Sequence, residues 1–265
     1  MSFEIIVCVK QVIDPEMPTS LFKIDSDTKK VVDSPDVAPI INGFDDNAVE
    51  AALQIKDQFD ANVTILSLGS HFALDVMKKP LAMGSDQLIL LQDDSFDNLD
   101  AYSTAFALSK GIQKIGSYDL ILCGRQASDW DNAQVPQGIA EFLDISCVTT
   151  AQKIDVSDNS LVVSRVLNDG IEVVQADLPA LISVSNELGE PRYANLKGIM
   201  AAARKVPTVW TADDIGLEAV GLLPKVSVID LSLPQKDEIC EFIEGQDESE
   251  IGKELAIRLR QEKLI

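Results

Sequence analysis

Short apolar runs and longer amphipathic stretches alternate along the first half of the chain. Four short, mainly apolar runs, the first of them unbroken and rich in β-branched residues, predict strands that are buried on both faces of a parallel sheet. They span residues 5–9, 63–68, 88–91 and 120–123. The stretches between and after them predict helices over residues 45–58, 72–83, 101–115 and 138–142. This alternation predicts parallel βαβ units, and therefore an open, mostly parallel α/β sheet.

Two of the predicted helices begin at or behind acidic residues, which can accept hydrogen bonds from the free N–H groups of a helix start. Asp45 or Asp46 is the candidate N-cap of helix 45–58. Asp100 is the candidate N-cap of helix 101–115.

The pattern changes after residue 147. Runs rich in valine and isoleucine are separated by Ser157-Asp158-Asn159 and by Asn168-Asp169-Gly170, which favour tight turns. We therefore expect hairpins over residues 147–184 and an antiparallel extension of the sheet.

The order of elements weakens after Pro207. A final amphipathic stretch, residues 251–264, brings Leu255, Leu259 and Lys263 to one side. We expect an α/β domain over residues 1–206 and a C-terminal arm over residues 207–265 that packs on a partner subunit.

Composition narrows the classes of function. The chain of 265 residues carries 43 acidic and 22 basic side chains, a formal net charge of −21. Because affinity for nucleic acid comes largely from lysine and arginine on phosphates, we expect no nucleic-acid partner. No apolar run approaches the roughly 18 residues of a membrane span, and residues 1–4 lack the cationic region of a secretory signal. We expect a cytoplasmic protein without membrane insertion.

Residues suited to catalysis or metal binding are sparse. The four cysteines lie far apart in the sequence and fit neither a disulfide framework nor a zinc site. His71 is the only histidine, and no cysteine has a base close to it in the sequence. We predict no catalytic residue and no metal site.

The most informative segment follows the strand predicted at residues 120–123. Gly124 opens a polar loop in which Arg125 carries a fork of N–H donors suited to an anion. The amides of Asn132 and Gln134 can recognise polar edges, and the helix start that follows adds main-chain donors. Ligands of open α/β sheets bind at the carboxyl ends of strands, which predicts a phosphate or pyrophosphate site here. An ordinary surface loop of turn-forming residues is the alternative.

The same loop, read as Gly124-Arg125-Gln126-Ala127-x-Asp129-x-Asp131, closely resembles that of electron transfer flavoprotein beta subunits. Motifs similar to those of this family cover nearly the whole chain. They are residues 7–12 (VCVKQV), 42–44 (NGF), 48–52 (AVEAA), 81–86 (LAMGSD) and a signature from Val163-x-Arg165 to residues 179–182 (PALI). The signature departs from the family pattern at Asn168 and at Ser183.

The resemblance implies a Rossmann-like fold of the adenine-nucleotide-binding type and a heterodimer with a flavin-carrying alpha subunit. In ordinary members the cleft of the beta subunit holds AMP. In electron-bifurcating members it holds FAD, which takes a hydride from NADH. Arg125, where ordinary members commonly have lysine, favours FAD. The implied cofactor residues are Cys8, Asn42, Asp45, Leu68, Gly124, Arg125, Gln126, Asp129, Asn132, Ala133, Gln134 and Val135.

Residues 190–196 (EPRYANL) resemble the partner-recognition loop of the same family, within a recognition segment of about residues 186–206. The resemblance implies that Leu196 is an apolar anchor, with Tyr193, Ile199 and Met200 beside it. The implied partner is a flavin-dependent dehydrogenase of the acyl-CoA or 2-hydroxy-acid type, and ferredoxin is a further candidate. An ordinary core leucine is the alternative for Leu196. A regulatory subunit that binds adenine nucleotide without redox chemistry is the alternative function.

Overall fold

The computed structural model describes residues 2–32, 34–157, 159–217, 222–234 and 240–265. The chain divides into two units, Met1–Ile229 and Asp230–Ile265. Among the described helices, none is long and apolar enough to cross a membrane.

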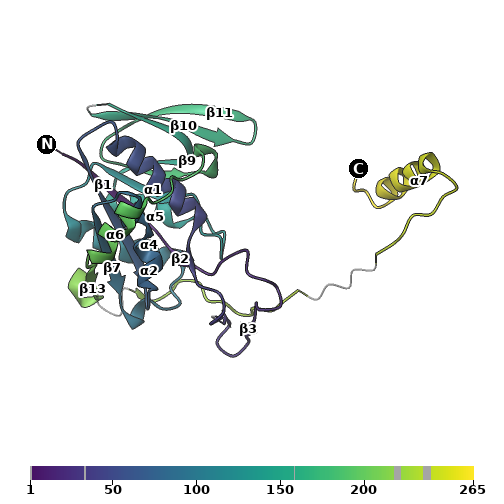
Figure 1. Ribbon diagram of the computed structural model, residues 1–265, viewed down its shortest axis with the longest axis horizontal. Coiled ribbons are helices and arrows are strands. Elements are labelled where there is room, and N and C mark those ends of the chain that lie inside the picture. Colours follow the sequence, from purple (N-terminus) through teal and green to yellow (C-terminus); the bar gives the residue numbers. More distant parts are fainter. Residues whose placement is uncertain (1, 33, 158, 218–221, 235–239) are drawn as a thin grey trace. The chain divides into compact units, whose positions relative to one another are not determined.

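Nine strands among the described residues form a sheet at the centre of the first unit (Figure 1). From β9 to β13 every neighbouring pair is parallel, while β10 and β11 extend the sheet as antiparallel strands. The strands, in their order across the sheet, are β11 (Gly170–Asp177), β10 (Ser160–Leu167), β9 (Ser146–Val156), β12 (Ala180–Val184), β8 (Leu120–Gly124), β1 (Phe3–Cys8), β6 (Ala61–Gly69), β7 (Gln87–Gln92) and β13 (Thr208–Trp210).

Smaller elements complete the first unit. Two short ribbons pair β2 (Gln11–Val12) with β5 (Ile40–Ile41), and β3 (Ile24–Asp25) with β4 (Lys30–Val31). The α-helices are α1 (Gly43–Lys56), α2 (Leu74–Met77), α3 (Lys79–Met83), α4 (Ala101–Ile115), α5 (Val135–Leu143) and α6 (Leu196–Arg204). Single 3₁₀ turns are η1 (Asp94–Phe96), η2 (Asn186–Leu188) and η3 (Asp213–Ile215).

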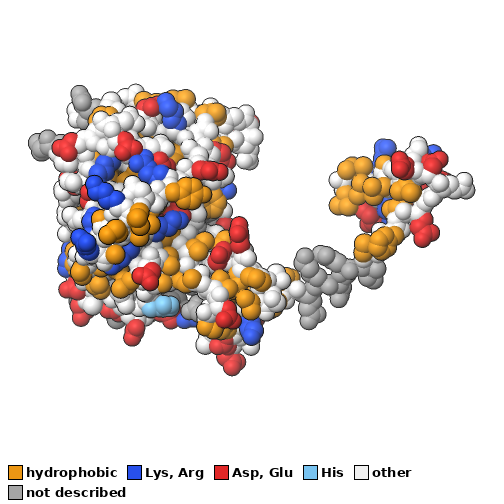
Figure 2. Space-filling model, in the orientation of Figure 1, with side chains coloured by type: hydrophobic (Ala, Val, Ile, Leu, Met, Phe, Trp, Pro, Cys, Tyr) orange, Lys and Arg blue, Asp and Glu red, His pale blue; other side chains and the backbone are white. Residues whose placement is uncertain are grey.

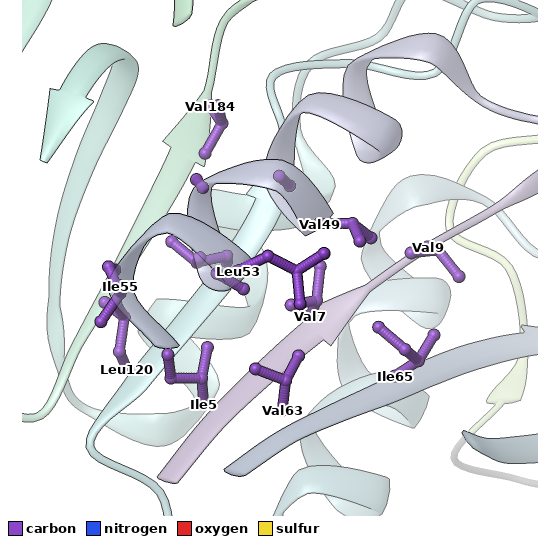
Figure 3. Close-up of a cluster of buried hydrophobic side chains, with 14 of the residues drawn as sticks. Ile5, Val7, Val9, Val49, Leu53, Ile55, Val63, Ile65, Leu120 and Val184 are labelled. Atoms are coloured by element: carbon purple, nitrogen blue, oxygen red, sulfur yellow. The ribbon is translucent and has the colours of Figure 1, made fainter. Parts of the chain in front are cut away.

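Side chains of successive strand residues point to opposite faces of the sheet and supply two hydrophobic cores. On one face Val7 and its neighbours pack against Leu53 and Val49 of α1 (Figure 3). On the other face Ile6 and Ile121 belong to the core that α4 and α5 cover. Each fully buried aliphatic side chain contributes about 1.5–3 kcal/mol to the stability of the fold. The packing of helices on both faces therefore stabilises the central strands.

The sequence predicted this architecture well. The four apolar runs are β1, β6, β7 and β8, and their pairing is parallel, as expected. Helix α4 has the predicted bounds, and Asp100 caps it by accepting the Ser103 N–H at 2.8 Å. The antiparallel extension is also confirmed, in β9 to β11.

The bounds of three predicted helices in the first unit are wrong, and so is one cap. The helix predicted over residues 45–58 is α1, Gly43–Lys56. The N-cap residue of α1 is Asn42, and Asp45 and Asp46 lie in its first turn. Residues 72–83 form two short helices, because Pro80 has no N–H to continue a single hydrogen-bonded ladder. Helix α5 begins at Val135 rather than residue 138, since Pro136 fits the first turn of a helix.

The segment 147–184 also differs in part from the prediction. Strand β12 is not a hairpin strand: it inserts between β9 and β8 and pairs with both in parallel. Its five residues are all buried, as expected of a central parallel strand. The turn expected at residues 157–159 includes residue 158, which lies outside the described residues, and the turn before Gly170 joins β10 to β11.

The described residues of the second unit form one helix, α7 (Glu248–Gln261), where the sequence predicted residues 251–264. Asp247 caps it by accepting the Glu250 N–H at 2.8 Å. None of its residues is buried. Packing of residues 207–265 on a partner subunit stays a prediction.

Candidate functional site

The carboxyl ends of four neighbouring parallel strands meet at one edge of the sheet. Cys8 of β1 pairs with Cys123 of β8 and with Leu66 of β6, and Val184 of β12 pairs with Gly124. This edge carries the loops in which the sequence placed the cofactor residues, and such edges hold the ligands of open α/β sheets.

Asp45 joins two of these strand ends. The Gly124 N–H donates to its Oδ1 at 3.0 Å, and the Lys10 N–H donates to its Oδ2 at 2.7 Å. A Cβ at Gly124 would lie 2.4 Å from Asp45 Oδ1 and 2.7 Å from the Phe44 carbonyl carbon. Glycine is therefore needed for the start of α1 to approach the end of β8 this closely.

Burial raises the pKa of Asp45 to about 7, although the N–H groups of Lys10 and Gly124 and the side chain of Asn42 act to lower it. The carboxyl group is fully enclosed, so the loss of hydration outweighs these hydrogen bonds. Its charge state changes near neutral pH.

Asn42 fixes the loop that follows β8. Its Nδ2 donates to the Gln126 carbonyl at 2.8 Å, and its Oδ1 accepts the Ser128 N–H at 3.1 Å. One residue further along, Asp129 forms a 2.6 Å ion pair with the Lys10 side chain. The first half of the loop is thus tied to the N-cap residue of α1 and to Lys10, two residues after β1.

The guanidinium of Arg125 has an N–H donor that no described residue accepts. Its Nη1 donates to Ser185 Oγ at 3.3 Å, and its guanidinium carbon lies 4.7 Å from the centre of the Phe44 ring. Its Nε is buried and has no hydrogen-bond partner among the described residues. An orphaned, charged donor beside the strand ends fits an anionic ligand.

Ser185 and Glu187 extend this contact. The Ser185 hydroxyl donates to Glu187 Oε2, and this hydrogen bond, with a smaller influence from Arg125, lowers the pKa of Glu187. Sequence reasoning did not identify Ser185, and it placed Glu187 only in the recognition segment of about residues 186–206. Their position follows from the pairing of β12 with β8, and the intervening residues 146–177 hide that pairing in the sequence.

The second half of the loop has an unusual backbone. Asp131 and Ala133 have φ values of 50° and 51°, in the left-handed region, and Gln134 returns to the right-handed α conformation. Within the described structure, the N–H groups of Asn132 to Val135 donate to no other residue. Consecutive N–H groups in such alternating conformations form concavities that bind anions.

The structure brings some of the predicted residues together more clearly than others. Asn42, Asp45, Gly124 and Gln126 are joined by direct contacts, and Gln126 Nε2 also reaches Asp131 Oδ1 at 2.8 Å. The remaining predicted residues share the edge without described contacts to that group. The side chain of Cys8 lies in the core under α4 and α5, Leu68 packs on the same core, and Asn132 and Gln134 are exposed.

A cavity of about 290 Å³ lies between the residues that follow β1 and those that follow β6. Gln11 lines it from the residues after β1, and His71, Phe72 and Ala73 line it from the residues after β6, together with part of the segment 13–39. None of the predicted cofactor residues is among its described lining. Among the residues that the structure describes, no cluster of three potential metal ligands occurs.

The recognition segment is held against α1. Arg192 donates to Glu50 from its main-chain N–H and from its guanidinium, at 2.8–3.1 Å, and also pairs with Asp57 at 2.8 Å. Asn47 Nδ2 donates to the Gly189 carbonyl at 2.7 Å. The four residues predicted to meet a partner, Tyr193, Leu196, Ile199 and Met200, are all exposed.

Comparison with known proteins agrees with this architecture. Residues 30–215 match the electron transfer flavoprotein domain, and the chain belongs to the electron transfer flavoprotein family. The chain is 37% identical to subunit CarD of the caffeyl-CoA reductase-Etf complex of Acetobacterium woodii, over 98% of this chain and 99% of that protein.

Two relatives are named as beta subunits of electron transfer flavoproteins. That of Thermoanaerobacterium thermosaccharolyticum is 40% identical over 91% of this chain and 92% of its own length. That of Megasphaera elsdenii is 36% identical over 99% of this chain and its own full length. The family predicted from the loop at residues 124–131 is therefore confirmed.

Proposed function

We propose that this chain is the beta subunit of a heterodimeric electron transfer flavoprotein, that it binds FAD at the carboxyl ends of β1, β6 and β8, and that NADH is the electron donor. With the alpha subunit it exchanges electrons with a flavin-dependent dehydrogenase. When bound, the FAD supplies hydride acceptance and onward electron transfer, so this chain needs no acid, base or nucleophile of its own.

The observation that carries the proposal is the orphaned Nε of Arg125. A buried charged donor without a partner destabilises the protein unless a ligand accepts its hydrogen bond. Phe44 and Ser185 hold the guanidinium in place. A phosphate is the ligand that best matches its fork of donors.

The loop at residues 131–135 supports the same ligand. Left-handed backbone at Ala133 costs about 1–2 kcal/mol for a residue with a Cβ. Such conformations are retained most often where they serve binding. The free N–H groups there and the start of α5 would receive the second phosphate of a dinucleotide.

The similarity to CarD supports the choice of partner. That relative is named as a subunit of a caffeyl-CoA reductase-Etf complex. We extend this to the present chain as a dehydrogenase of the acyl-CoA class, contacted through Leu196 and its exposed neighbours. A small apolar anchor suits a contact that must form and release quickly.

Replacing Arg125 tests the site. Arg125→Ala removes a charged donor pair, which is worth about 1.5–3 kcal/mol, so we expect the affinity of the purified heterodimer for FAD to fall about tenfold or more. Isothermal titration calorimetry of the nucleotide-depleted heterodimer with FAD measures this affinity. Arg165→Ala is the control, since Arg165 binds Thr149 and Glu172 in β9 and β11. Equal FAD affinity in the two variants would reject the assignment of Arg125.

A further inference from the structure

The guanidinium of Arg125 is a cation at the strand ends with which no described carboxylate forms an ion pair. Acidic side chains outnumber basic ones by 43 to 22 in this chain and occur at many places on the face of the molecule shown in Figure 2. Lys10, two residues after β1, is compensated by its ion pair with Asp129. The orientation of the Arg125 side chain therefore has a large influence on how strongly a nucleotide anion is held.

Ser185 contacts the guanidinium through its hydroxyl group. This hydroxyl accepts a hydrogen bond from Arg125 Nη1 at 3.3 Å and donates one to Glu187 Oε2. Ser185 is also the N-cap residue of η2, yet its side chain makes no capping hydrogen bond. Serine at an N-cap commonly accepts a main-chain N–H of the turn that follows. The hydroxyl group of Ser185 instead links Arg125 to Glu187.

The sheet fixes the position of Ser185, which is fully buried. Its main-chain N–H donates to the Ala151 carbonyl at 2.9 Å, and its carbonyl accepts the Leu188 N–H at 3.1 Å. The Arg125 N–H in turn donates to the Val184 carbonyl at 2.9 Å. Because both main chains are anchored at the ends of paired strands, the contact between the two side chains needs little ordering when a ligand binds.

Glu187 acts on Arg125 through Ser185, since no direct ion pair joins the two in the described structure. A hydroxyl group that donates to a carboxylate becomes a stronger acceptor, because hydrogen bonds in a chain polarise one another. Glu187 therefore strengthens the hydrogen bond between Ser185 and Nη1. The Arg125 Nε, which has no partner among the described residues, stays available to a ligand.

The carboxylate of Glu187 also brings a negative charge close to the guanidinium. The hydrogen bond from Ser185 and, to a smaller extent, the charge of Arg125 lower the pKa of Glu187, so the carboxylate is ionised at neutral pH. A terminal phosphate such as that of AMP gathers about −1.5 to −2 charges on one group at pH 7, whereas each phosphate of a dinucleotide carries a single charge. A nearby carboxylate therefore repels the terminal phosphate more strongly.

We infer that Ser185 and Glu187 are positioning residues of the nucleotide site, which hold Arg125 for the diphosphate of a dinucleotide and disfavour the terminal phosphate of a mononucleotide. The inference rests on the proposed function and names residues that select its ligand. Ser185 acts through Arg125 on the affinity for both kinds of nucleotide. Glu187 acts mainly on the ratio between the two affinities.

The test compares the affinities of FAD and AMP for the heterodimer after the nucleotide of this chain has been removed, by isothermal titration calorimetry. Ser185→Ala removes the hydroxyl group and should lower both affinities about three- to tenfold. The double variant Arg125→Ala/Ser185→Ala should bind FAD as Arg125→Ala does, because the effects of residues that act through one another are not additive. A role of Ser185 in folding alone would give additive losses.

Glu187→Gln keeps an acceptor for the Ser185 hydroxyl and removes the charge. We expect it to shift the ratio of the two affinities about threefold in favour of AMP, an effect limited by the exposure of this side chain. Asp177→Asn is the matched control, because Asp177 is also exposed but precedes the amino end of β12, at the opposite edge of the sheet. It should leave the ratio unchanged.

The outcomes separate this inference from the function on which it rests. Normal affinities in Ser185→Ala, additive losses in the double variant, or an unchanged ratio in Glu187→Gln would each overturn the inference alone. Normal FAD affinity in Arg125→Ala, or no binding of FAD at this site by the unmodified heterodimer, would overturn the proposed cofactor site as well.

Discussion

Asp45 shows how one buried carboxyl group can organise the end of a sheet. It accepts main-chain N–H groups from the ends of two adjacent strand segments, at Lys10 and Gly124. No other described group competes for these two donors. The site depends on this residue through the backbone that it holds, whether or not it touches the ligand.

Its pKa makes a specific prediction for stability. A folded pKa of about 7, above the ordinary value of 3.8, means that the neutral carboxyl group favours the folded state. Its contribution is complete below about pH 4 and is lost as pH rises through about 7, a difference of about 4 kcal/mol. In urea unfolding, the free energy of the unmodified protein should fall relative to that of Asp45→Asn over this range. If the unfolding free energies of the two proteins changed in parallel with pH, the raised pKa of Asp45 would be contradicted.

The residues of the site could be predicted from the sequence only in part. The loop motif at residues 124–131 identified Arg125 and its neighbours, because those residues are contiguous. Asp45 was expected as a helix cap or cofactor contact, and its role as a tie between β1 and β8 depends on a contact across 79 positions. Ser185 and Glu187 could not be predicted for the same reason: they lie near Arg125 only because β12 pairs with β8, and this contact joins distant parts of the sequence.

The helices and strands were predicted more accurately than the residues at which they begin and end. Helical periodicity placed α4 and short apolar runs placed β1, β6, β7 and β8, whereas single prolines decided the bounds of α2, α3 and α5. Strand β12 resembled the neighbouring hairpin strands in composition, so local sequence could not reveal that it inserts into the parallel sheet. The C-terminal edge strand β13 has only three residues and no periodicity to detect.

Helix α6 allows a direct test of element packing. In Gly198→Ala the added Cβ would meet the Ala82 carbonyl at 2.2 Å, so α6 must move away from α3. We expect a loss of about 1–3 kcal/mol in stability, measured by thermal unfolding. Gly252→Ala in α7 is the matched control, because nothing lies within 4 Å of its new Cβ and alanine favours helix by up to about 1 kcal/mol. Equal stability losses in both would show that α6 does not depend on this close approach.

In the whole molecule, the proposed cofactor site and the proposed partner contact are built from different elements. The edge formed by β1, β6 and β8 carries the donors proposed for the nucleotide. Helix α1 contributes Asn42 and Asp45 to that edge, and its Glu50 holds the recognition segment through Arg192. Helix α1 thus supports both the proposed cofactor site and the recognition segment.

Identifying the nucleotides bound to the purified heterodimer tests whether this chain holds FAD. Denaturation releases bound nucleotides, which liquid chromatography and mass spectrometry then identify and count against protein concentration. The account predicts two FAD molecules per heterodimer, one of them held by this chain. One FAD and one AMP would keep the site but reject FAD as its occupant, and the absence of any adenine nucleotide beyond that of the alpha subunit would contradict the site itself.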